Sequence, residues 1–239
     1  PQARIHQTEF TQPALFALEF AMAELWRSWG IRPASVIGHS IGELAAACVA
    51  GVMSLEDAMG LVLERGRLMQ QLPAGGAMTS VAASEAWVRE VLDRIGGSAV
   101  VAAVNGDEQT VIAGLKADVD RAAVALEDMG VRSTPLVVSH AFHSPLLGPM
   151  LDRFEAVARG IRFAPPRVRL ISNLTGSAAD ATLLSDPSYW RRHARDAVRF
   201  VDGIRTLGSM KPQVYLEVGP HPTLLGLTAT ALGGEAGVL

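Results

Sequence analysis

The chain has almost no cysteine, no long apolar run and no excess of charge of either sign. Among its 239 residues Cys48 is the single cysteine, which excludes an internal disulfide and fits a reducing cytoplasm. No apolar run reaches the ~20 residues needed to span a bilayer. A net charge of −3, from 21 basic and 24 acidic residues, argues against nucleic acid or an anionic membrane as partner. We therefore predict a cytoplasmic globular protein that binds neither, and we predict no metal site.

The apolar content is high enough for a sizeable core. Hydrophobic residues make up 49% of the sequence, which suits one large domain or two lobes. The chain starts at Pro1 without an initiator methionine or a signal peptide. We therefore expect it to be a piece of a longer protein.

The most informative segment is the pentapeptide Gly-His-Ser-Ile-Gly at positions 38–42. It follows an apolar stretch, residues 34–37, and opens a helix-forming run, residues 43–47. A serine between two glycines at a strand-to-helix turn is typical of a nucleophile elbow, in which the hydroxyl projects beyond the end of the strand. We predict that Ser40 is a nucleophile and that the backbone N–H of Ile41 points to where an oxyanion would form.

A second feature is a cation on the apolar face of a predicted helix. Residues 54–57 have the spacing of a capping box, and the helix that they begin should run to about Gln71. At about 100° per residue, Arg65 shares a face with Leu61 and Met69. Burying a guanidinium costs several kcal/mol unless an anion meets it. Arg65 should therefore face either an internal carboxylate or the carboxylate of a ligand, and helical geometry leaves both open.

The middle of the chain predicts a small inserted lobe. Residues 76–138 read as strand, helix, two strands, helix and strand, the βαββαβ order of a ferredoxin-like unit, with Asn105-Gly106 at the central hairpin. Residues 1–75 and 139–239 alternate between helices and apolar strands, with residues 189–207 expected to be mostly helical and residues 214–218 to form a strand. This alternation predicts a parallel sheet covered on both faces. The fold class is thus α/β, with a cleft between the two lobes where a small molecule would bind.

A serine nucleophile needs a base, and four histidines follow Ser40. His140 and His143 lie where the small lobe returns to the large one, so either could reach Ser40. His193 sits among arginines and is interpreted as a surface residue, and His221 as a turn residue and weaker candidate. No acidic third member is evident, which favours a Ser-His dyad.

Six motifs in order give the chain a resemblance to the malonyl-type acyltransferase domains of type I modular polyketide synthases and, more distantly, to bacterial malonyl-CoA:acyl carrier protein transacylases. The resemblance covers essentially the whole chain. The matching segments are Thr11-Gln12-Pro13-Ala14-Leu15-Phe16, Gly38-His39-Ser40-Ile41-Gly42-Glu43, Arg65 at its family distance from the serine, His140-Ala141-Phe142-His143-Ser144-Pro145-Leu146, Ser172-Asn173-Leu174-Thr175-Gly176 and Glu217-Val218-Gly219-Pro220-His221-Pro222.

This resemblance implies an α/β-hydrolase-like lobe, residues 1–75 and 139–239, with a ferredoxin-like subdomain, residues 76–138. It implies that Ser40 is acylated by malonyl-CoA, that His143 is the base, oriented by a backbone carbonyl, and that Arg65 binds the free carboxylate. The acyl group would then pass to the phosphopantetheine thiol of an acyl carrier protein. No cofactor would be bound by the domain itself. Ketosynthase and linker domains of the same synthase would be its neighbours.

The resemblance also implies which acyl group is chosen. Malonyl-type domains carry His-Ala-Phe-His, as here, where methylmalonyl-type domains carry Tyr-Ala-Ser-His, and they have a residue other than Gln after the serine. Phe142 would fill the space that an α-methyl group needs, although one methyl group is worth only ~1–3 kcal/mol of discrimination. We expect His39, Ile41, His140, Phe142 and Asn173 to complete the substrate site beside Arg65.

Other functions stay open at the level of sequence. The family begins with a Gly-Gln-Gly-type segment before the position of Thr11, and we expect its absence here to limit the activity of the isolated chain. A methylmalonyl or other extender could be the substrate. A serine hydrolase or thioesterase would use the same elbow and dyad, although it has no need of a buried Arg65. A non-catalytic docking domain is the third possibility.

Overall fold

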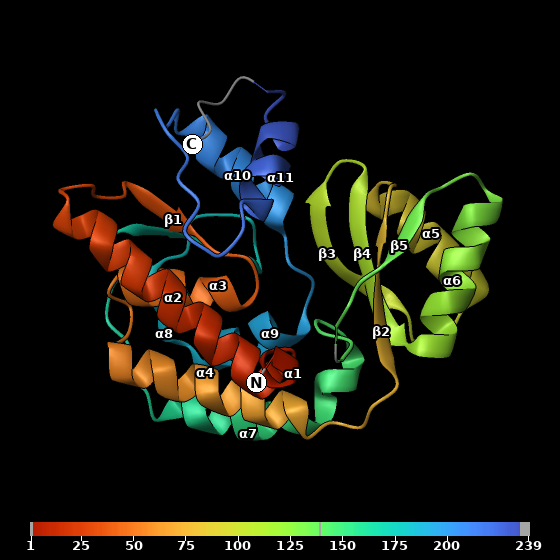
Figure 1. Ribbon diagram of the computed structural model, residues 1–239, viewed down its shortest axis with the longest axis horizontal. Coiled ribbons are helices and arrows are strands. Elements are labelled where there is room, and N and C mark those ends of the chain that lie inside the picture. The colour runs from red at the N-terminus through yellow and green to blue at the C-terminus, as the bar shows by residue number, and fades with distance from the viewer. Residues whose placement is uncertain (1, 139, 235–239) are drawn as a thin grey trace.

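A computed structural model of the protein describes residues 2–138 and 140–234. Its helices and strands fall into two groups that lie side by side (Figure 1). One group combines many helices with a short parallel sheet, and the other is built on an antiparallel sheet. The mixed α/β class expected from the sequence is confirmed.

The first group surrounds two short strands with helices. The strands β1 (Ser35–Ile37) and β6 (Arg169–Ile171) pair in parallel. The helices of this group are α1 (Gln2–Ile5), α2 (Thr8–Ser28), α3 (Ile41–Val49), α4 (Leu55–Gln70), the 3-10 helix η1 (Pro145–Leu147), α7 (Gly148–Arg159), α8 (Ala181–Ser185), α9 (Pro187–Arg195), α10 (Phe200–Ser209) and α11 (Thr223–Ala231). Among the described residues, every helix is too short or too polar to span a lipid bilayer.

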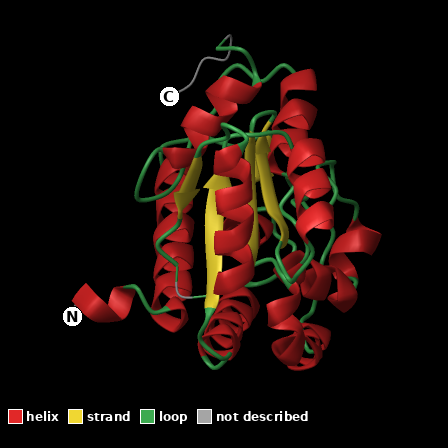
Figure 2. Ribbon diagram, turned by 90° about the vertical axis from the view of Figure 1, so that its right-hand side faces the viewer, coloured by secondary structure: helices red, strands yellow, loops and turns green. Residues whose placement is uncertain are grey.

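The second group is the predicted βαββαβ unit. Its strands β2 (Gly76–Val81), β3 (Val100–Gly106), β4 (Gln109–Leu115) and β5 (Ser133–Pro135) are ordered β3-β4-β2-β5, with antiparallel neighbours. The helices α5 (Glu85–Ile95) and α6 (Lys116–Asp128) lie together in front of this sheet in Figure 2. This order matches the ferredoxin-like arrangement expected from the sequence.

Two details differ from the sequence-based expectation. The segment predicted as mostly helical over residues 189–207 divides into α9 and α10, and between them Val198 forms a parallel bridge with Ala103 of β3. The Val104 N–H donates to the Val198 carbonyl at 2.8 Å, so this segment joins the two groups. The strand predicted over residues 214–218 is absent: only Tyr215 forms a bridge, and Val214, which a core strand would bury, is 51% exposed.

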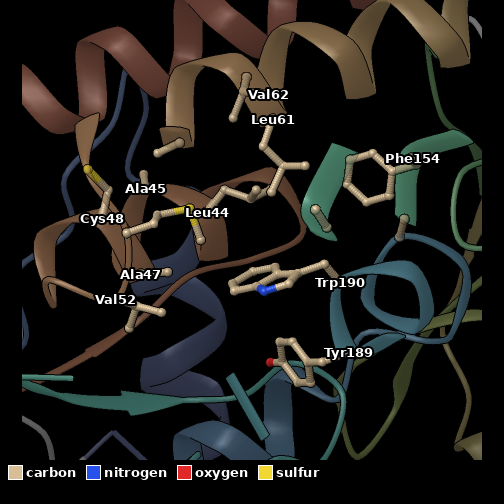
Figure 3. Close-up of a cluster of buried hydrophobic side chains, with 14 of the residues drawn as sticks. Leu44, Ala45, Ala47, Cys48, Val52, Leu61, Val62, Phe154, Tyr189 and Trp190 are labelled. Carbon is tan, nitrogen blue, oxygen red and sulfur yellow. The ribbon is translucent and has the colours of Figure 1, made fainter. Parts of the chain in front are cut away.

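The main core fixes the helix that follows the elbow. Figure 3 shows Trp190 of α9 with its ring beside Leu44 of α3, and Leu61 of α4 above them. All three side chains are fully buried. The Trp190 indole N–H donates to the Leu184 carbonyl at 3.1 Å, so burial leaves no polar atom of this side chain unpaired. The helix α3, whose first residue follows Ser40, thus packs against side chains of both α4 and α9.

Candidate active site

The serine lies at the sharp turn between β1 and α3, as the pentapeptide predicted. Ser40 has φ 53° and ψ −115°, a left-handed conformation that costs a residue with a Cβ of order 1–3 kcal/mol. A Cβ at Gly38 would lie 2.1 Å from the backbone nitrogen of Glu43, so only glycine fits there. At Gly42 the nearest atom would be 3.7 Å away, an ordinary contact. Close approach of the backbone thus requires the first glycine of the elbow and not the second.

The Ser40 hydroxyl contacts His143. Its Oγ lies 2.6 Å from Nε2 of the imidazole, and Nδ1 on the other side of the ring lies 2.9 Å from the backbone carbonyl of Asp196. A carbonyl only accepts, so Nδ1 carries the proton and Nε2 is free to accept from the serine. His143 also has a positive φ, 54°. Strain at both members of the pair is typical of a functional site.

The imidazole is neutral in this environment. Burial first, and then the positive charges of Arg65 and His39, lower the pKa of His143 to about 3. A neutral imidazole that accepts a hydrogen bond from a serine can take up its proton. The geometry therefore allows His143 to accept the proton of the Ser40 hydroxyl.

Arg65 reaches the same hydroxyl from α4. One guanidinium nitrogen, Nη2, lies 3.2 Å from Ser40 Oγ, and Nη1 donates a short hydrogen bond to the Gln12 side-chain carbonyl. The residue is only 2% exposed, and its Nε has no hydrogen-bond partner. Burial lowers its pKa to about 10, which leaves it cationic at neutral pH. Among the described residues no carboxylate lies within 4 Å of it, so the internal-carboxylate alternative has no support.

The remaining predicted site residues lie at different depths. The His39 side chain meets Asn105 of β3 at 2.8 Å, which connects the elbow to the antiparallel unit. His140 is buried, with Nε2 at 3.3 Å from the Leu72 carbonyl, and Phe142 is partly buried with its ring beside that of His140. Asn173 lies beneath the elbow with its amide bonded to the backbone on both sides of His39.

The interpretation of His193 as a surface residue is wrong. It is 3% exposed and packs against the rings of His143 and Tyr189, and its Nε2 lies 3.7 Å from a carboxylate oxygen of Glu43. On α9 it faces inward while the neighbouring arginines face outward, so their charges in the sequence gave a misleading signal. Spacing would have helped, because Tyr189 and His193 are four residues apart on one helix face.

Two further groups at the site had no sequence signal of their own. The Asp196 carbonyl comes from the interrupted part of the helix predicted over residues 189–207. Glu43 lies in the first turn of α3, and its side chain is fully buried. The Ile41 N–H begins α3, and within the described residues it makes no hydrogen bond, which leaves it available to an anion at the helix N-terminus.

Fold and site together define the class of the protein, an acyltransferase with an attached antiparallel unit. A family model described as acyl transferase domain matches residues 1–236, and the chain therefore belongs to the acyl transferase domain family. No group of three potential metal ligands occurs among the described residues.

The relatives place the chain among polyketide synthase domains. It is 50% identical over 232 residues to the polyketide synthase GfsA of Streptomyces halstedii, covering 97% of this chain and 3% of that protein. The acyltransferase domain from the second module of the salinomycin polyketide synthase superposes with a TM-score of 0.96 at 48% identity, over 100% of this chain and 56% of that one. The resemblance to such domains is thus confirmed.

A transacylase is similar as well. The malonyl CoA-acyl carrier protein transacylase of Coxiella burnetii superposes with a TM-score of 0.94 at 32% identity, over 100% of this chain and 77% of that one. The same fold thus occurs in this transacylase and in polyketide synthases, and the chain spans only a small fraction of the length of the synthases that it matches.

Proposed function

We propose that the protein transfers a malonyl group from malonyl-CoA, through an ester on Ser40, to the phosphopantetheine thiol of an acyl carrier protein in polyketide biosynthesis. Its neighbours would be the ketosynthase and linker domains of the same synthase. Residues 76–138 would act as a subdomain that closes one side of the substrate cleft. Malonyl-CoA would be a substrate and no cofactor would be bound.

The observation that carries the proposal is the buried cation beside the nucleophile. A guanidinium that is 2% exposed without a carboxylate partner costs several kcal/mol, which a bound anion would offset. Nη2 of this guanidinium lies 3.2 Å from Ser40 Oγ, so an anion bound to Arg65 would lie close to the proposed nucleophile. A planar fork can hold a carboxylate by two hydrogen bonds, and a malonyl thioester carries its carboxylate two bonds from the thioester carbon. An ester or an acetyl thioester offers no such group.

The reaction follows from the contacts. His143 Nε2 takes the proton of Ser40, and the alkoxide attacks the thioester carbon to give a tetrahedral anion, which the Ile41 N–H stabilises. The C–S bond breaks, the proton passes from His143 to the leaving CoA sulfur, and malonyl-Ser40 remains. The carrier thiol then gives its proton to His143 and attacks the ester carbon. The bond from that carbon to Ser40 Oγ breaks, His143 returns the proton to Oγ, and the malonyl group leaves as the thioester of the carrier.

Transfer and hydrolysis are separated by the fate of the malonyl group. We expect wild-type protein with malonyl-CoA and excess pantetheine to form malonyl-pantetheine faster than malonate, measured by liquid chromatography with mass detection. A loaded carrier protein should form faster still, because it supplies the thiol in a docked orientation. If malonate accumulates at the same rate with and without a thiol, the protein is a hydrolase and transfer is wrong.

Selection of the extender is proposed to depend on Phe142. Replacing its ring by the smaller side chain in Phe142→Ser should make room for an α-methyl group and raise the methylmalonyl-to-malonyl ratio of kcat/KM by about 10-fold. Competition between the two CoA thioesters, read from the acylated protein by mass, measures that ratio. Phe163→Ser, at a partly buried ring stacked on Trp190, is the control. An unchanged ratio in Phe142→Ser would remove this residue from the specificity account.

A further inference from the structure

A cluster of buried polar side chains lies directly beneath the elbow. Glu43 and Ser172 are fully buried, Asn173 is 1% exposed and Tyr189 is fully buried. None of these groups touches the Ser40 hydroxyl, and the proposed reaction uses none of them. A buried carboxylate is expensive unless it is hydrogen-bonded, so the partners of this cluster indicate what it does.

Asn173 holds the backbone on both sides of the nucleophile. Its side-chain Oδ1 accepts from the Ser40 backbone N–H at 2.7 Å, and its Nδ2 donates to the Gly38 carbonyl at 2.7 Å. One planar amide thus spans the turn in which Ser40 takes its positive φ. A strained residue keeps its conformation only where the surroundings over-determine it, and these two bonds supply such a constraint.

Glu43 in turn holds Asn173. One carboxylate oxygen, Oε2, accepts from the Asn173 backbone N–H at 2.5 Å, and the other accepts from the Tyr189 hydroxyl. That hydroxyl also lies 2.8 Å from Ser172 Oγ, which precedes Asn173 in the chain. The carboxylate therefore anchors the loop after β6 to α3 and α9, and the loop presents the Asn173 amide to the elbow.

We propose that Asn173 and Glu43 are positioning residues: Asn173 fixes the attack conformation of Ser40, and Glu43 acts through Asn173. The inference rests on the proposed role of Ser40 as nucleophile. It gives Asn173 a different place from the substrate contact expected from the sequence, because both ends of its amide are engaged by the protein.

The chemistry of Glu43 suggests a matched control. Burial raises its pKa to about 7, so the pocket tolerates a neutral group at this position. Glutamine keeps an oxygen for the Asn173 N–H, and its amide can donate to the Tyr189 oxygen, whose own proton then turns to Ser172 Oγ. Glu43→Gln should therefore preserve the anchor that Glu43→Ala removes.

The test is the rate at which a fluorophosphonate, which needs no acyl-CoA site, labels Ser40 at pH 7.5. We expect Asn173→Ala and Glu43→Ala to lower the second-order rate constant by about 10- to 100-fold, since a displacement near 1 Å has this effect on an aligned nucleophile. Glu43→Gln should stay within about 3-fold of wild type. So should Thr110→Val, which removes a buried hydrogen bond to the Ala83 carbonyl and none of the bonds among Ser40, Asn173, Glu43 and Tyr189. Rates are compared at equal folded fraction, measured by near-ultraviolet circular dichroism.

Each outcome decides the inference. The inference is wrong if Asn173→Ala is labelled at the wild-type rate. It is also wrong if Glu43→Gln is labelled as slowly as Glu43→Ala, because only the anchoring role predicts that glutamine restores the rate. If Asn173→Ala does not fold, Asn173→Asp takes its place. Aspartate keeps the oxygen that accepts from the Ser40 N–H, but its second oxygen cannot donate to the Gly38 carbonyl, so we expect slower labelling. Labelling of Asn173→Asp at the wild-type rate would contradict the account. A wild-type protein that is not labelled at Ser40 would overturn the proposed function together with this inference, whereas labelled wild type with unaffected variants overturns the inference alone.

Discussion

The variant Arg65→Ala is expected to lose about 10²-fold in kcat/KM for malonyl-CoA, because it removes a charge-assisted hydrogen-bonded fork worth ~3 kcal/mol. Acetyl-CoA, which lacks the free carboxylate, should be affected far less, so the malonyl-to-acetyl preference collapses. Stopped-flow or quench measurements of CoA release with each thioester give both values. The expected change is one of specificity, which a general loss of folded protein would not produce.

The same helix offers the control. Arg67 lies two residues along α4 with its guanidinium paired to Glu64 on the outer side of the helix. Arg67→Ala should leave both thioesters unaffected. Arg65→Lys keeps a charge but not the planar fork, and we expect it to fall between wild type and Arg65→Ala. Equal losses for malonyl-CoA and acetyl-CoA in Arg65→Ala would show that Arg65 supports the fold and does not bind the carboxylate.

The variant His143→Ala is expected to lower the rate of Ser40 acylation by about 10²- to 10⁴-fold, the contribution of a positioned general base. The measurement is the single-turnover rate of CoA release. His140→Ala distinguishes the two histidines of this loop, since His140 is also buried but is expected to contact substrate and not to act as the base, so it should lose far less of the acylation rate. If His140→Ala were as slow as His143→Ala, the result would contradict the identification of His143 as the base.

The pH dependence of the wild type checks the same base. A proton acceptor works in its neutral form, and the pKa of His143 is lowered from 6.5 to about 3, so the acceptor is neutral throughout pH 5–8. We therefore expect fluorophosphonate labelling to lose little rate between pH 8 and pH 5 and to fall only below that. A descending limb centred near pH 6.5 would contradict this environment for His143.

Local features of the site could be predicted from the sequence. The elbow is contiguous, so its glycines and helix-forming run are enough to place Ser40 at a strand-to-helix turn. The inward side of Arg65 follows from helical periodicity along α4. The order of strands and helices in residues 76–138 follows from alternation and from the Asn-Gly turn, and the antiparallel sheet has that order.

Other features depend on packing between distant segments and could not be read from local patterns. The choice between His140 and His143 depends on which imidazole faces Ser40, 103 residues away from His143. Asp196 contributes a backbone carbonyl, a group that every residue has and that no sequence pattern marks. This carbonyl lies just after the end of α9, where the chain leaves the helix and Val198 pairs with Ala103 of β3. His193 was misplaced because arginines surround it in the sequence, whereas helical rotation separates it from them.

The most direct test of the account is the intact mass of the protein after brief incubation with malonyl-CoA, compared with the Ser40→Ala variant. The account predicts a malonyl adduct on wild type that peptide mapping assigns to Ser40, that Ser40→Ala lacks, and that pantetheine removes as malonyl-pantetheine. An adduct that persists in Ser40→Ala, or release of CoA without any acylated protein even under rapid quench, would contradict the acyl-serine route.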